Sequence, residues 1–142
     1  MNSDSQRKSL IITGRCECSS IHFAVDGEVT DFSHCHCSQC RRMHGAAYAT
    51  FAGVQRKDFK LLSGKEDIAS FNSSDSHERQ FCRVCGSNIL IYLDSEPESL
   101  YLSMGAVDGN PALPPAYHIF VGSKAPWHNI TDDLPKYVEE PD

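Results

Sequence analysis

Short runs of β-branched and aromatic residues recur along the chain, with Gly, Asn, Asp, Ser or Pro between them. In residues 21–25 apolar positions alternate with polar or small ones, the period-two pattern of a half-buried strand, and Asp26-Gly27 is expected to close that strand. The other predicted strands cover residues 9–13, 46–52, 59–62, 68–71, 78–81, 88–93, 100–104 and 118–121.

Helical signals are weak. No window keeps a 3.6-residue apolar period over three turns, and six prolines between residues 97 and 135 interrupt the second half of the chain. One helical turn is expected at residues 41–44, ended by Gly45. The pattern therefore predicts a mainly β fold, either two small antiparallel sheets packed face to face or a partly open barrel.

The length of 142 residues fits one domain, predicted over residues 9–137, with an N-terminal tail at 1–8 and a C-terminal tail at 138–142. The longest fully apolar run, residues 89–93, is far below the roughly 20 residues of a membrane span. The first residues lack the apolar stretch of a secretory signal. We therefore expect a cytoplasmic protein without a membrane partner. The net charge of −6, without a basic cluster, argues against nucleic acid.

The seven cysteines change this picture more than any other feature. In a chain without an export signal, cysteines at these spacings are more often metal ligands than disulfides or unliganded thiols. Sulfur-only knuckles in a small β-rich chain favour zinc over an iron-sulfur cluster. The cysteines divide into a group of four and a group of three, which predicts two zinc ions: Cys16, Cys18, Cys82 and Cys85, then Cys35, Cys37 and Cys40.

The group of four has the number of ligands that a closed tetrahedral zinc site needs. Cys82 and Cys85 form a C-x-x-C-G knuckle in which Gly86 supplies a positive φ. Their expected partners, Cys16 and Cys18, lie on a predicted turn between two strands. This zinc would tie the N-terminal turn to a central hairpin, so we interpret it as structural.

The group of three leaves one zinc position open, which is typical of a catalytic or ligand-binding site. His34, His36 and His44 are the candidate fourth ligands. In an extended segment His36 faces away from Cys35 and Cys37, so a surface or hydrogen-bonded role suits it better. Ligation by His44 remains an alternative, and it would make the second zinc structural as well.

An open position beside three thiolates suits a soft ligand. Three thiolates give the zinc site a net negative charge, so it activates bound water less than a three-histidine zinc does. We therefore expect a thiol substrate, which would lose its proton at the zinc and act as a nucleophile. Arg41 and Arg42 follow Cys40 directly and would bind a substrate carboxylate, with two solvated arginines as the alternative. Trp127 is expected either to cover the site or to pack in the core or at a sheet edge.

These motifs resemble the glutathione-dependent formaldehyde-activating enzyme family, which includes centromere protein V. The resemblance runs from about residue 14 to residue 137 and departs at Ser19, where the family usually has Gly. It is carried by Gly14-x-Cys16-x-Cys18, Ile21-x-Phe23, Cys35-His36-Cys37-x-x-Cys40-Arg41 with Gly45, Phe81-Cys82-x-x-Cys85-Gly86, His118-Ile119-Phe120-Val121, Pro126-Trp127 and Asp132-Asp133-Leu134-Pro135.

The resemblance implies a β-tent fold stapled by zinc, with a structural ion on the group of four and a catalytic ion on the group of three. It also implies a carbon-sulfur lyase that joins glutathione and formaldehyde to S-hydroxymethylglutathione, or reverses that addition. The expected partners are thus a small thiol and a small carbonyl compound. A non-catalytic zinc module that binds a thiol or a protein partner is the alternative. The sequence leaves a homo-oligomer open.

Overall fold

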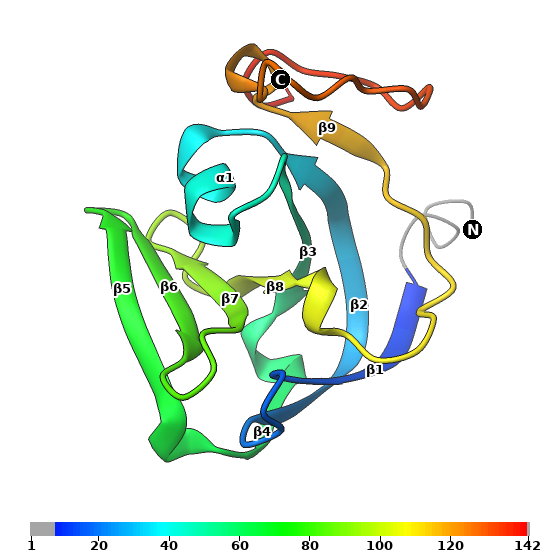
Figure 1. Cartoon of the computed structure of the whole chain (residues 1–142). Helices are drawn as coiled ribbons and strands as arrows, with labels where there is room; N and C mark the ends of the chain where they lie inside the picture. Colours follow the sequence, from blue (N-terminus) through cyan, green and yellow to red (C-terminus); the bar gives the residue numbers. More distant parts are fainter. Residues whose placement is uncertain (1–7, 142) are drawn as a thin grey trace. The chain divides into compact units, whose positions relative to one another are not determined.

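The computed structural model describes residues 8–141 (Figure 1). These residues form two compact units, each built from two chain segments: residues 8–30 with 52–113, and residues 31–51 with 114–141. The mainly β class is confirmed. The single domain over residues 9–137 stays a prediction, and most of the predicted N-terminal tail lies outside the described residues.

Nine strands are assigned within residues 8–141, and eight of them overlap a predicted strand over most of its length. They are β1 (Lys8–Arg15), β2 (His22–Cys35), β3 (Ala49–Gln55), β4 (Phe59–Ser63), β5 (Ile68–Ser74), β6 (His77–Cys82), β7 (Asn88–Leu93), β8 (Ser99–Ser103) and β9 (Tyr117–Ile119). The only α-helix among the described residues is α1 (Ser38–His44). Single 3-10 turns are found at Arg56–Asp58, Lys65–Asp67, Met104–Ala106 and Val121–Ser123. Within residues 8–141, no helix is long and apolar enough to cross a lipid bilayer.

The first unit is organised by antiparallel pairing. The sheet follows the order β1-β2-β3-β8-β7-β6-β5, and β4 pairs with β2. Strands β5, β6 and β7 form a meander in which Phe81 of β6 stands opposite Ala69 and Asn88. The buried side chains include Ile21, Phe23, Ile89, Leu100 and Leu102. This core fixes the turn before β2 and the loop after β6, which carry the two cysteine pairs.

Strand β2 is longer than predicted. The expectation that Asp26-Gly27 closes the strand was wrong, because β2 continues to Cys35. Gly27 stands opposite Leu10 in the pairing with β1. A Cβ atom on Gly27 would lie 2.1 Å from the Asp58 carboxylate, so this glycine serves close approach within a strand rather than a turn. As a result, β2 connects the first cysteine pair to the C-x-C-x-x-C stretch without a break.

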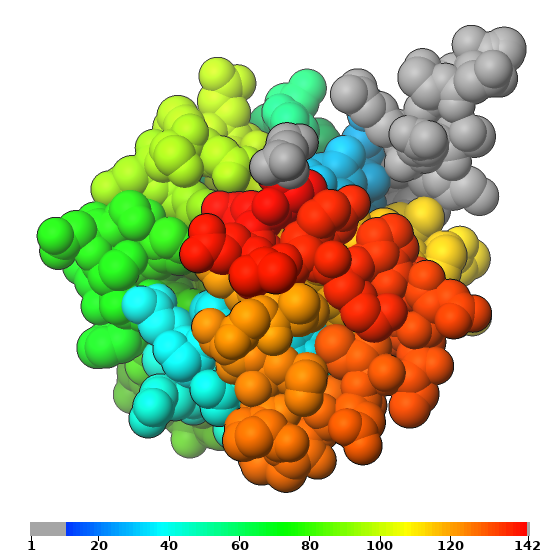
Figure 2. Space-filling view, turned by 90° about the horizontal axis from the view of Figure 1, so that it is seen from above, coloured from blue at the N-terminus to red at the C-terminus, as the bar shows by residue number. Residues whose placement is uncertain are grey.

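The second unit holds the end of β2, helix α1 and the C-terminal segment. Residues 33–35 of β2 pair in parallel with residues 117–119 of β9. After β9 the chain returns alongside it: His118 N–H donates to Pro135 O, and Tyr137 N–H donates to His118 O. Phe120 N–H also donates to Glu139 O. Figure 2 shows this C-terminal segment in red, lying against the orange residues that precede it.

Helix α1 is one turn longer than the predicted residues 41–44. It begins at Ser38 because Cys37 caps it: the Cys37 Sγ accepts the backbone N–H of Cys40 at 3.3 Å. It ends at Gly45, whose φ of 58° confirms the predicted glycine stop. The cap draws Cys37 and Cys40 toward the same end of the helix.

Candidate metal centres

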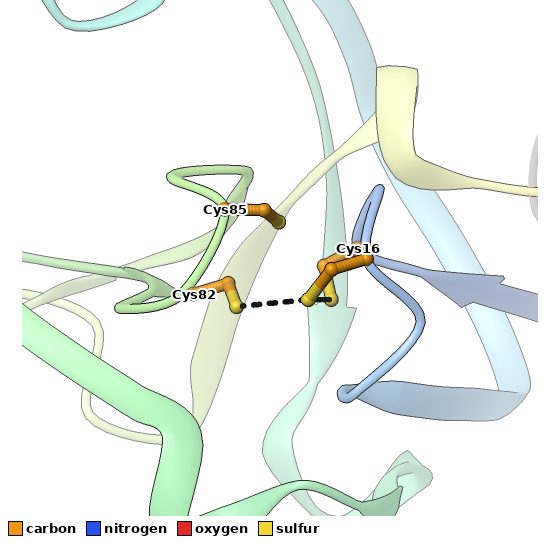
Figure 3. A group of neighbouring side chains, drawn as sticks. Cys16, Cys82 and Cys85 are labelled. Carbon is orange, nitrogen blue, oxygen red and sulfur yellow. Dashed lines mark hydrogen bonds between the residues drawn. The ribbon is translucent and has the colours of Figure 1, made fainter.

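The group of four cysteines is assembled in the first unit. The Sγ atoms of Cys16, Cys18, Cys82 and Cys85 all lie within 4.8 Å of one another. Figure 3 shows the loop that carries Cys82 and Cys85 facing the turn that carries Cys16. The Sγ–Sγ distance is 3.6 Å for Cys16 and Cys18 and 3.8 Å for Cys18 and Cys82.

These distances fit zinc. A tetrahedral Zn–S₄ site with bonds of about 2.3 Å has sulfur–sulfur edges of about 3.8 Å, whereas a disulfide bond is about 2.05 Å long. None of the seven cysteines, all of which lie within the described residues, forms a disulfide bond. The group of four therefore has the donor set, the number of ligands and the spacing of a closed zinc site.

Local backbone structure explains how the first pair turns inward. Ser19 N–H donates to Cys16 O, and Cys16 N–H donates to Ile21 O, which closes a tight turn. Ser19 has a φ of 68°, the left-handed region that favours glycine, and Arg15 donates to its hydroxyl. Ser19 thus adopts a conformation that favours glycine, at a cost in backbone strain.

The second pair lies on a knuckle of the predicted type. Gly86 has a φ of 84° and donates its N–H to Cys82 O. The Cys82 sulfur also accepts the Val84 N–H at 3.4 Å. Hydrogen bonding to Ser87 is the main cause that lowers the pKa of the Cys85 thiol to about 5. These donors stabilise thiolates, the form in which cysteine binds a metal.

The group of three lies in the second unit. Cys35 ends β2, Cys37 caps α1 and Cys40 is in the first turn of α1, and their three sulfurs lie within 4.8 Å of one another. Cys35 and Cys40 are buried and Cys37 is half-buried. The neighbouring Cys37 and Cys40 thiols raise the pKa of the Cys35 thiol. Such crowding opposes ionisation of Cys35, and a bound cation would offset it.

The three histidines considered as fourth ligands are not part of this group. His34 Nδ1 lies 2.7 Å from the Thr50 hydroxyl. The His44 ring packs edge-on against Phe51. His36 is fully buried and hydrogen-bonded, which agrees with the hydrogen-bonded role inferred for it. Among the described residues the metal-ligating group therefore consists of three sulfurs.

His36, which stands between Cys35 and Cys37 in the sequence, belongs to a set of aromatic rings and imidazoles that the sequence patterns did not identify. We call it the histidine cluster, and it consists of His34, His36, His118, His128 and Tyr48. The centroid of the His34 ring lies 4.6 Å from that of the Tyr48 ring and 4.8 Å from that of the His118 ring. Burial is the main cause that lowers the pKa of His36, to about 4, and the charges of His118 and His128 add to it. The sequence singled out His34 and His36 as candidate ligands and placed His118 in a predicted strand, but no pattern joined them.

The predicted substrate residues take different positions. Arg41 Nε donates to Ser123 O at 3.1 Å, so this arginine ties α1 to the turn after β9. Arg42 is exposed on the helix. Trp127 is 70% exposed, which excludes the alternative that it packs in the core. The centroids of its ring and of the His128 ring lie 6.3 Å apart. The His128 ring in turn lies 6.3 Å from His36. Trp127 thus borders the histidine cluster.

Comparisons with known proteins agree with the motif pattern. The profile of the family described as glutathione-dependent formaldehyde-activating enzyme matches residues 11–123. A protein of Schizosaccharomyces pombe named as an uncharacterized lyase is 32% identical over 76 residues, which are 54% of this chain and 53% of that protein. The chain therefore spans about half the length of this relative. A crystal structure of a Rhodobacter sphaeroides protein matches with a TM-score of 0.59 and 25% identity, over 70% of this chain and 92% of the other.

Proposed function

Because the chain belongs to the glutathione-dependent formaldehyde-activating enzyme family, we propose that it is a zinc-dependent carbon-sulfur lyase of the cytoplasm. Its substrates would be adducts of glutathione, or a similar thiol, with formaldehyde or another small carbonyl compound. The observation that carries the proposal is the contrast between the two cysteine groups. One provides four sulfurs at tetrahedral spacing, and the other provides three.

The proposed reaction is an addition without a redox step. The thiol sulfur forms a bond to the carbonyl carbon, the carbonyl π bond breaks, and the thiol proton ends on the oxygen to give an S-hydroxymethyl product. The reverse reaction breaks the same carbon-sulfur bond and returns both substrates. When bound, a zinc ion on Cys35, Cys37 and Cys40 would supply a Lewis-acidic position for the substrate sulfur.

The chain's own residues would bind and orient the thiol. Arg41 has its Nε committed to Ser123 O, which leaves its terminal nitrogens for a carboxylate. Arg42, one position on and exposed, would provide a second cation. Trp127 offers an exposed ring beside the histidine cluster, where it would contact the body of the substrate. Glutathione carries two carboxylates, so two adjacent arginines suit it.

Cobalt substitution tests whether a thiol reaches the second metal. Protein with Co²⁺ in both sites is titrated with glutathione while the sulfur-to-cobalt charge-transfer band is followed. We expect the band to grow with glutathione and to stay unchanged with S-methylglutathione, whose sulfur carries no proton. A Cys40→Ala variant, which retains the first site, should not respond. An unchanged band at saturating glutathione would favour the non-catalytic module instead.

Catalysis needs its own test, because thiols add to formaldehyde without help. NMR exchange spectroscopy at equilibrium measures how fast glutathione and S-hydroxymethylglutathione interconvert. The zinc-loaded protein should raise this rate above the buffer rate, and Cys40→Ala should not. A wild-type rate equal to the buffer rate would remove the lyase assignment while leaving thiol binding intact.

A further inference from the structure

A hydrogen-bonded chain of three side chains runs from the surface into the histidine cluster. Asp132, 44% exposed, lies with its Oδ2 2.9 Å from His118 Nε2. The other nitrogen of the same ring, His118 Nδ1, lies 2.8 Å from His36 Nε2. His118 and His36 are 1% and 0% exposed. The last atom of this hydrogen-bonded series, His36 Nδ1, is buried and has no hydrogen-bond partner among the described residues.

With neutral imidazole rings, the carboxylate fixes where every proton lies. An ionised carboxylate only accepts, so His118 must carry its proton on Nε2. His118 Nδ1 is then a lone pair that accepts from His36 Nε2–H. His36 therefore has its lone pair on Nδ1. The reverse direction would place the His118 Nε2 lone pair against the carboxylate and leave an unsatisfied N–H at His36 Nδ1, two costs that the first arrangement avoids.

His36 is held by its backbone as well as by its ring. Its N–H donates to Ile119 O at 3.0 Å, next to the parallel pairing of β2 with β9. Since Cys35 and Cys37 flank His36 in the sequence, the conformation of His36 sets the direction in which these two sulfurs leave the backbone. Residues that fix His36 therefore act on the geometry of the group of three.

We propose that Asp132 is a positioning residue for the second cysteine group: through His118 it holds His36 in one tautomer and ring orientation, and thereby aligns Cys35 and Cys37. The proposal rests on the metal site of the proposed function. Partners one step outside a metal's ligands typically change metal affinity about 10–100-fold, and at this greater remove we expect the lower end, about tenfold.

The tautomer is read by ¹⁵N NMR of the histidine rings at pH 8, with His36 identified by the signals lost in a His36→Gln variant. We expect the wild type to show His36 protonated on Nε2 only. Asp132→Ala should broaden or exchange this signal, and Asp132→Glu should restore it. Asp133→Ala, at the exposed neighbouring position, is the matched control and should leave it unchanged.

Metal affinity is read separately for the two sites by competition between Co²⁺-loaded protein and a chelator. Asp132→Ala should weaken cobalt binding about tenfold at the second site and leave the first site, an internal control for folding, unchanged. His118→Asn keeps an acceptor near the position of Nδ1 and should rescue part of the loss that His118→Leu causes.

Two results would overturn the proposal: His36 protonated on Nδ1 in the wild type, or an unchanged tautomer and second-site affinity in Asp132→Ala. Failure of the proposed function looks different. If glutathione leaves the cobalt band unchanged while Asp132→Ala still alters the His36 tautomer and the second-site affinity, the positioning role stands and the thiol chemistry does not.

Discussion

The sulfurs of Cys18 and Cys82 lie 3.8 Å apart, although 64 residues separate them along the chain. Between them the chain forms five of the nine strands of the described residues, β2 to β6. A metal on these sulfurs would therefore close a long loop, because Cys18 and Cys82 are 64 residues apart. Structural zinc sites contribute about 10–16 kcal/mol, and a whole domain has a net stability of about 5–15 kcal/mol.

The two cysteine groups should differ in what their loss does to folding. Cys85→Ala removes one ligand of the group of four, and we expect it to yield aggregated or unfolded protein. Cys40→Ala removes one ligand of the group of three, and we expect it to fold with one zinc ion in place of two. Atomic emission measures how many zinc ions each variant binds, and circular dichroism measures whether it is folded. Soluble, folded Cys85→Ala protein with both ions bound would contradict the structural assignment.

Gly64 should be among the least replaceable glycines. It has a φ of 89°, and a Cβ atom there would lie 2.3 Å from Ser20 O and 2.8 Å from the Ile21 Cα. Gly64→Ala combines left-handed strain with a clash against backbone, and we expect it to cost about 2–4 kcal/mol of stability.

Gly109→Ala is the matched control. Its φ is 70°, but nothing lies within 4 Å of the added atom, so strain alone should cost about 1 kcal/mol. Urea unfolding of the zinc-loaded variants measures both values. Equal losses of stability in the two variants would show that the clash with residues 20 and 21 adds nothing to the cost of Gly64→Ala.

Tyr117 should ionise at a higher pH than an ordinary tyrosine. Burial raises the pKa of its hydroxyl, which also donates to Asp31 Oδ1 at 2.8 Å, and the carboxylate charge and the nearby Tyr137 raise it further, while Ser33 lowers it in part. Because the pKa is higher in the folded protein, the stabilisation is fully present below about pH 10, the ordinary tyrosine value, and declines as pH rises above it.

Absorbance at 295 nm measures this ionisation. The titration of the wild type should contain a late component that Tyr117→Phe removes. The stability advantage of the wild type over Tyr117→Phe should shrink above pH 10. Burial also raises the pKa of Tyr92, so the test concerns the latest component: if that component survives in Tyr117→Phe, it belongs to another tyrosine.

Arg42 should contribute to affinity through a substrate carboxylate. Its exposure predicts a modest effect, so Arg42→Ala should weaken glutathione binding about three- to tenfold at low salt. Glutathione diethyl ester, which lacks the carboxylate charges, should bind both proteins equally. Isothermal titration calorimetry gives the four dissociation constants. An equal loss for the free acid and the ester would exclude a carboxylate contact.

The strand pattern and the cysteine spacing were predictable because both are local. Alternating residues and turn signals located the strands, and C-x-C-x-x-C and C-x-x-C-G define their own geometry within a few residues. Gly27 misled the prediction, because an isolated glycine marks a close approach in a strand as readily as a turn. Only the pairing with Leu10 and the contact with Asp58 distinguish the two.

The histidine cluster was not predictable in the same way. His36 and His118 are 82 residues apart, and their hydrogen bond depends on the parallel pairing of β2 with β9. A sequence pattern gives no register for a parallel pair whose strands are joined by a long crossover. Asp132 lies in a segment without regular secondary structure, so periodicity carried no information about it.

The parallel pairing of β9 with the end of β2 also sets an order of assembly during synthesis. A nascent chain that has emerged as far as residue 113 already contains all seven cysteines. It contains neither β9, which holds the His36 backbone, nor Asp132, at the outer end of the hydrogen-bonded chain. The ligands of the second group thus leave the ribosome before the segments that support them.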